Sequence, residues 1–236
     1  MLASGEHFHV TCPIMSGTSV ALIVRPAPEL TTSGLTDRQV KLELALASTA
    51  RFLRIGPVAV VVASRSQLQV AKGMGSSTAD IVTGARALAC AYGTTLTPGQ
   101  LARVTTGIEL SDGTMCPGII SFCRQSGEVL REFSWYPRFA VVIVIPRDSV
   151  VTESVEFARK ARFAGEFEHV LACLDDAAAR QDQLPFAHAA TRSATINQEY
   201  LPNRLFDLLC REQARLGAAG LQAPCAPSCP VTFGSR

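Results

Sequence analysis

The chain has 236 residues, of which 47% are hydrophobic and 18% charged, and its formal net charge is +2. This composition indicates a globular protein rather than a disordered one, and the balanced charge gives no sign of a nucleic-acid or anionic-membrane partner. The longest apolar runs, such as residues 139–146, are far shorter than the ~20 residues that span a bilayer. Residues 1–10 lack the basic and apolar regions of a secretory signal, so we expect a cytoplasmic protein.

The eight cysteines do not form a recognisable metal or disulfide pattern. Six of them occur singly in apolar or helical contexts, where a thiol behaves as a small hydrophobic group. Cys225 and Cys229 are close together, but no second pair of His or Cys stands at zinc-finger spacing. We therefore expect reduced thiols, and the role of this pair stays open.

The first third of the chain alternates strand-like and helical patterns. Residues 7–14 and 19–24 are strand-like, and His7 and His9 are expected to be polar positions on a half-exposed strand. Residues 26–34 are rich in Pro, Thr, Ser and Gly and predict a loop. Residues 37–55 predict an amphipathic helix with an apolar face of Val40, Leu44, Leu46, Ala47, Phe52 and Leu53.

A short β-branched run, residues 57–63, predicts a buried strand ahead of the most informative stretch, Lys72-Gly73-Met74-Gly75-Ser76-Ser77-Thr78-Ala79-Asp80. Glycines let a backbone approach a ligand closely, and the N-terminus of a helix offers unpaired N–H groups and the positive end of its dipole. The helix is predicted by Ile81, Ala85, Leu88, Ala89 and Tyr92 on one face, with Gly93 as its stop. Strand, glycine loop and helix together predict a phosphate-binding site.

This loop differs from two common nucleotide-binding motifs. A P-loop places Gly-Lys-Ser/Thr after its glycines, whereas Lys72 precedes them here, and the third glycine of the dinucleotide fingerprint is absent. The simpler alternative is a serine-rich cap on an ordinary core helix.

Further along, Thr97-Pro98 predicts the start of a helix that runs through Val104. The segment Ile108-Glu109-Leu110-Ser111-Asp112-Gly113-Thr114 then places two carboxylates three residues apart in a turn. Such a pair can hold magnesium and orient an attacking hydroxyl beside a phosphate loop. Taken alone, the segment is better explained as an acidic, solvated turn.

The second half of the chain begins with three predicted strands and continues with helices. The strands are residues 119–123, 129–133 and 139–145, with Gln125-Ser126-Gly127 as a hairpin turn. Helical stripes follow, formed by Phe167, Val170, Leu171, Leu174 and Ala178, by residues 187–196, and by Leu205, Leu208, Leu209 and Leu216. Residues 223–230 contain too many prolines for a central strand.

Two of these segments resemble a known family. Val70–Ile81 is similar to the second motif of the GHMP kinases, such as galactokinase, homoserine kinase and mevalonate kinase, and most closely to the L-threonine kinases of cobalamin side-chain synthesis. Gln69 stands where the family usually has proline. Residues 109–114 resemble the Glu-x-x-Asp-Ser/Gly-Thr element that follows this loop in threonine kinases.

The resemblance implies an α+β, GHMP kinase-like fold with a mixed sheet and a phosphate loop before a helix. Residues 1–146 would be the ATP-binding domain, 147–222 a partial C-terminal domain and 223–236 a divergent tail rich in Pro and Cys. The implied reaction transfers the γ-phosphoryl group of ATP to the hydroxyl of L-threonine, with Mg²⁺, in cobalamin biosynthesis. The implied ATP-binding residues are Lys72, Gly73, Met74, Gly75, Ser76, Ser77 and Thr78. Ser77 and Glu109 would hold Mg²⁺, and Asp112 would be the catalytic base.

Several alternatives stay open. Lys72 either neutralises phosphate or is solvated, and Thr78 and Asp80 either act in the site or only cap the helix. The family's opening Cys-Gly-Glu motif and its second glycine-rich loop have no match here, so we expect the chain as given to be a poor catalyst. The rival functions are a GHMP kinase for another small alcohol and a non-catalytic nucleotide-binding remnant, and no oligomeric state is implied.

Overall fold

The computed structural model describes residues 8–14, 16–70, 72, 74–144, 162–199, 202–222 and 231–234. They form two compact units. One, here the N-terminal unit, comprises His9–Gln69 and Gly75–Glu132; the other, here the C-terminal unit, comprises mainly the described residues from Phe133 onward and also contains Lys72 and Met74. The predicted domain boundaries at 146 and 222 border segments outside the described residues, so they remain predictions.

The N-terminal unit contains the mixed sheet that the resemblance implies. β2 (Thr18–Pro26) pairs antiparallel with β4 (Val58–Ser66), and β3 (Thr31–Ser33) pairs parallel with β4 on its other side. The prediction of a loop throughout residues 26–34 is therefore wrong at β3, since three polar residues at a sheet edge carry no hydrophobic pattern. The prediction that residues 57–63 are buried is correct for one face only, because Val61 is 48% exposed between buried valines.

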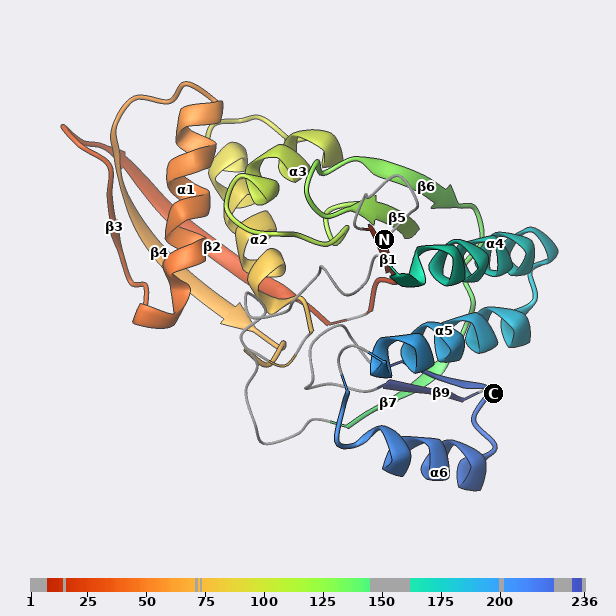
Figure 1. Cartoon of the computed structure of the whole chain (residues 1–236). Helices are drawn as coiled ribbons and strands as arrows, with labels where there is room; N and C mark the ends of the chain where they lie inside the picture. The colour runs from red at the N-terminus through yellow and green to blue at the C-terminus, as the bar shows by residue number, and fades with distance from the viewer. Residues whose placement is uncertain are drawn as a thin grey trace. The chain divides into compact units, whose positions relative to one another are not determined.

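Two helices pack side by side over this sheet (Figure 1). They are α1 (Val40–Phe52), which follows a short 3₁₀ turn at Asp37–Gln39, and α2 (Ser76–Ala91). The helix predicted over residues 37–55 is present, but α1 itself is shorter at both ends. The predicted apolar face is correct at Leu46, which is buried, and wrong at Val40 and Leu44, which are exposed. Leu42 and Ala45, which were not predicted, are buried instead. Because α1 has apolar residues on both faces, packing against α2 and β4 selects the buried one.

The remaining elements of the N-terminal unit agree with the sequence predictions. α3 (Pro98–Thr106) begins with a capping box, in which Thr97 Oγ1 accepts from Gln100 N at 3.2 Å and Gln100 Oε1 accepts from Thr97 N at 2.8 Å. β5 (Ile119–Cys123) and β6 (Val129–Phe133) form a sheet with β1 (Phe8–Thr11), in the order β1-β5-β6. The predicted hairpin turn is confirmed by a hydrogen bond from Gly127 N to Cys123 O at 3.0 Å.

The described residues of the C-terminal unit form three helices and a small sheet. The helices are α4 (Ala164–Arg180), α5 (Gln183–Gln198) and α6 (Phe206–Leu216), and the predicted stripe on α4 is buried. β9 (Val231–Gly234) lies between β7 (Ala140–Ile143) and β8 (Gly220–Gln222), antiparallel to both. Residues 231–234 were predicted to belong to the tail, because four residues next to a Pro-rich segment carry little strand signal.

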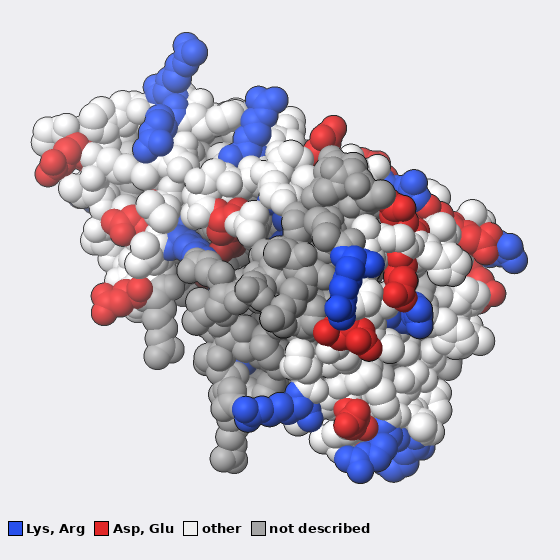
Figure 2. All heavy atoms as spheres, viewed as in Figure 1, with Lys and Arg blue, Asp and Glu red and all other residues white. Residues whose placement is uncertain are grey.

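Charge is mixed on the molecular surface. On the face drawn in Figure 2, the described Lys and Arg side chains are interspersed with Asp and Glu, in keeping with the small net charge. Among the described residues, every helix is too short or too polar to cross a bilayer.

Candidate active site

The N-terminus of α2 is built around Gly75. This residue is the helix N-cap, with a left-handed φ of +68°, and the helical ladder begins with Ala79 N donating to Gly75 O at 2.9 Å. A Cβ at this position would lie only 3.0 Å from Oδ2 of Asp112. Glycine has no side chain to cap the first N–H groups, so the backbone of the first turn can bind an anionic ligand.

Glu109 connects α2 to α1. Ser77 Oγ donates to its Oε2 at 2.8 Å, and Thr78 Oγ1 donates to its Oε1 at 3.0 Å. Lys41, in the first turn of α1, forms an ion pair with Oε2 at 2.5 Å. Ser77 and Glu109 were predicted to act together, whereas Lys41 was not predicted, because it stands 68 residues from its partner with no local motif to indicate it.

Asp112 is the second carboxylate of the turn. Burial raises its pKa above the ordinary value, the Glu109 charge adds to this, and His9 together with hydrogen bonds from Thr114 oppose it. Thr114 N donates to Oδ1 at 3.2 Å. A carboxylate with a raised pKa is a better proton acceptor near neutral pH, as a general base requires. His9 was predicted to be an ordinary polar strand position, but it lies close enough to influence this carboxylate.

The acidic turn is fixed by buried neighbours. Arg124, only 6% exposed, donates through Nη2 to Leu110 O at 3.3 Å and through Nε to Ser111 O at 3.4 Å. Gly113 N donates to Thr11 Oγ1 of β1 at 3.1 Å. The turn between the two carboxylates is thus attached both to β1 and to the residue that follows β5. Arg124 was not predicted to take part, because its contact with the turn depends on how the second sheet folds.

A third carboxylate, Asp80, lies one turn into α2. Its pKa is raised by burial and by the Glu109 charge, and lowered by a hydrogen bond with the Thr18 side chain. Asp80 therefore interacts with the start of β2.

The predicted ATP-binding residues divide between the two units. Gly75, Ser76, Ser77 and Thr78 lie together at the start of α2, with Ser76 and Thr78 buried. Lys72, which is buried, and Met74 belong to the C-terminal unit. Gly73 lies outside the described residues. The structure thus brings Ser77, Thr78, Glu109 and Asp112 together around Gly75, and this set defines the candidate site.

The oxygens of Ser77 and Glu109 are suitable ligands for one hard divalent cation that also binds phosphate oxygens. No group of three or more His, Cys, Asp or Glu among the described residues is arranged to hold a metal by itself. Mg²⁺ usually takes one or two carboxylates plus phosphate and water, and adjacent ligands of its octahedron stand about 2.9 Å apart. Ser77 Oγ and Glu109 Oε2 are 2.8 Å apart, so they fit two neighbouring positions of such an octahedron.

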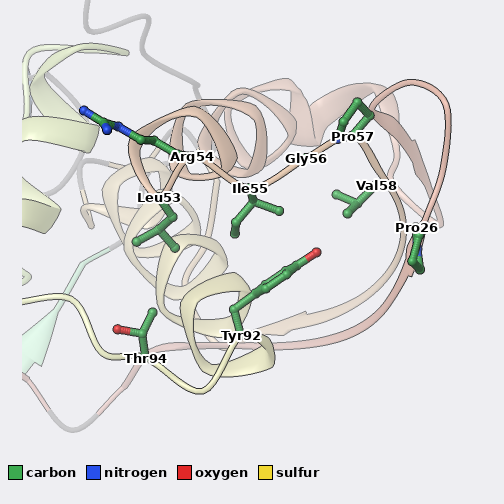
Figure 3. Close-up of a pocket in the computed structure, with 9 residues that line it drawn as sticks. All are labelled: Pro26, Leu53, Arg54, Ile55, Gly56, Pro57, Val58, Tyr92 and Thr94. Carbon is green, nitrogen blue, oxygen red and sulfur yellow. The ribbon is translucent and has the colours of Figure 1, made fainter.

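A surface depression lies elsewhere on the N-terminal unit (Figure 3). It is lined by residues 53–57, which follow α1, by Val58 at the start of β4, by Pro26 at the end of β2, and by Tyr92 and Thr94 after α2. α2 has 16 residues, which is about 24 Å of helix, so the depression is remote from the carboxylates. We do not assign it to the candidate site.

Comparison with known proteins supports the family that the sequence resembles. Residues 42–120 match the model of the GHMP kinases N terminal domain. An L-threonine kinase of Salmonella typhimurium is 28% identical over 151 residues. Residues 42–120 are therefore similar to the N-terminal domain of the GHMP kinases. The match to that curated relative covers 61% of this chain and spans half of the relative's length.

Solved GHMP kinases share the fold. L. major mevalonate kinase, in complex with R-mevalonate, gives a TM-score of 0.75 at 16% identity and covers 99% of this chain and 82% of its own. Streptococcus pneumoniae phosphomevalonate kinase, in complex with phosphomevalonate and AMPPNP, gives a TM-score of 0.67 at 11% identity. The match covers 90% of this chain and 82% of that kinase. The α+β, GHMP kinase-like fold is therefore confirmed.

Proposed function

We propose that this protein is an ATP-dependent kinase that phosphorylates the hydroxyl of a small molecule, and that L-threonine is the acceptor. The observation that carries the proposal is the meeting of Glu109 with the hydroxyls of Ser77 and Thr78 at the start of α2, next to Asp112. Phosphoryl transfer depends chiefly on positioning and on offsetting negative charge, and this arrangement supplies groups for both.

Each group has a distinct part in this proposal. The first-turn N–H groups of α2 would bind phosphate oxygens, with Gly75 leaving room for their approach. Ser77 and Glu109 would hold Mg²⁺, which offsets phosphate charge when bound. Asp112 would orient the acceptor hydroxyl and accept its proton, for which a raised pKa is suitable.

The choice of acceptor rests on the curated relative, which is an L-threonine kinase. The phosphomevalonate kinase neighbour was solved with AMPPNP, an ATP analogue, which supports ATP as the phosphoryl donor. The proposed product is O-phospho-L-threonine, and through the resemblance we assign it to cobalamin side-chain synthesis.

The test is transfer of label from γ-labelled ATP to a panel of L-threonine, L-serine, L-homoserine, mevalonate and galactose. We expect Mg²⁺-dependent labelling of L-threonine, which disappears with Asp112→Asn. Preferential labelling of another alcohol would reassign the acceptor. ATP binding without any transfer would establish a non-catalytic nucleotide-binding protein and overturn the proposal.

A further inference from the structure

Lys41 holds the oxygen of Glu109 that the proposed metal would need. Its Nζ lies 2.5 Å from Oε2, the same atom that accepts from Ser77 Oγ at 2.8 Å. The other oxygen, Oε1, already accepts from Thr78 at 3.0 Å. Both oxygens of this carboxylate thus have partners, and the ammonium group of Lys41 is in direct contact with Oε2.

The two side chains differ in their freedom to move. The Glu109 side chain is 13% exposed and held by two hydroxyls of α2, whereas that of Lys41 is 39% exposed. A lysine side chain has a flexible four-carbon stem, so its ammonium can leave the carboxylate without any backbone movement. Glu109 is therefore the fixed partner and Lys41 the displaceable one.

A divalent cation and this ammonium group would exclude each other at Oε2. Mg²⁺ binds oxygen at 2.0–2.1 Å, so a lysine nitrogen on the same oxygen would lie within a few ångströms of it. Two cations at that separation repel strongly in a half-buried site. Without metal, the ammonium offsets the negative charge of Glu109, which otherwise repels Asp80 and Asp112.

We propose that Lys41 is an internal counter-cation that competes with the divalent metal for Glu109 and so sets the metal affinity of the site. This inference rests on the proposed role of Glu109 as a metal ligand. Lys41 is a positioning residue here, since it acts through Glu109 and not on the substrate. Lys41 makes metal binding weaker than it would be at Glu109 without a neighbouring cation. The metal would then bind best when phosphate is present, because phosphate adds further negative charge.

The test is Mn²⁺ binding, followed by electron paramagnetic resonance, on the whole chain without nucleotide. We expect Lys41→Gln to bind Mn²⁺ roughly tenfold more tightly than the parent protein, because one repelling charge is gone. Lys41→Arg keeps the charge and should remain near the parent affinity. Arg51→Gln is the matched control, since it removes an exposed cation from the last turn of the same helix and should change nothing.

Glu109→Gln separates the two proposals. If it leaves Mn²⁺ affinity unchanged, Glu109 is not a metal ligand and the proposed function loses its metal site. If it weakens binding while Lys41→Gln leaves affinity unchanged or lowers it, Lys41 merely supports Glu109 and the inference alone is overturned. Circular dichroism of each variant identifies any loss of folding that would itself weaken binding.

Discussion

Gly75 and Asp112 approach each other so closely that a Cβ on residue 75 would stand 3.0 Å from Oδ2 of Asp112. Glycine is thus favoured at position 75 for two reasons: a side chain would crowd Asp112, and the left-handed φ of +68° suits glycine best. This contact joins the glycine loop to the acidic turn, two segments that are 37 residues apart in the sequence (112 − 75).

We expect Gly75→Val to lower ATP affinity by about 100-fold or more, because its Cβ would crowd both the phosphate approach and Asp112. The matched control is Gly93→Val, which has nearly the same φ of +67° but open space around it. It shares the backbone strain and lies at the other end of α2, so its ATP affinity should be unchanged. Isothermal titration of both folded variants decides the matter; equal ATP affinities would mean that the loop is not the nucleotide site.

Asp112→Asn should lower turnover by ~10²-fold or more with little change in ATP affinity, since it removes a proton acceptor and keeps the shape. Single-turnover measurements with labelled ATP test this directly. A variant as fast as the parent protein would show that Asp112 has no part in the chemistry.

The same substitution should also change the pH dependence of stability. Because the folded-state pKa of Asp112 is raised, its ionisation opposes folding, and its contribution is most favourable below the ordinary Asp pKa of ~3.9. Asp112→Asn should therefore raise the denaturation midpoint at pH 7, and the gain should shrink as the pH falls toward 4. A gain that stays constant with pH would contradict a raised pKa.

Glu109→Gln should raise the Mg²⁺ concentration needed for half-maximal turnover, because a neutral amide is a weaker ligand for a hard cation. ATP affinity measured without metal should be much less affected. The comparison of rates across a Mg²⁺ titration checks this, and a shared midpoint for parent and variant would remove Glu109 from the metal site.

The contact between α1 and α2 provides a test of the fold. Gly84 of α2 faces Leu42, and an added Cβ would run into Cδ1 of that leucine. We expect Gly84→Ala to lower the free energy of unfolding by about 1–3 kcal/mol through overpacking. Gly99→Ala, in α3 with open space around it, should instead raise it by up to about 1 kcal/mol. Urea denaturation of both variants measures the difference; a Gly84→Ala protein as stable as the parent would contradict this packing.

Sequence alone predicted the features that depend on neighbouring residues. The Thr97 cap, the Gly127 turn and the start of α2 at Ser76 all follow from local hydrogen bonding and backbone preference. The pairing of Ser77 with Glu109 was implied by two motifs read together, and their hydrogen bond agrees with it. The roles of these residues in binding and catalysis remain proposals.

Only the tertiary structure decided which face of α1 is buried and which distant groups reach the acidic turn. Val40 and Leu44 fit the helical period as well as Leu42 does. Which of these side chains is buried is therefore decided by the packing of α1 against α2 and β4. Lys41, His9 and Arg124 reach the turn from α1, from β1 and from the turn after β5. Side chains brought together by sheet pairing and helix packing leave no periodic signal along the chain, because their spacing in sequence is set by the intervening elements.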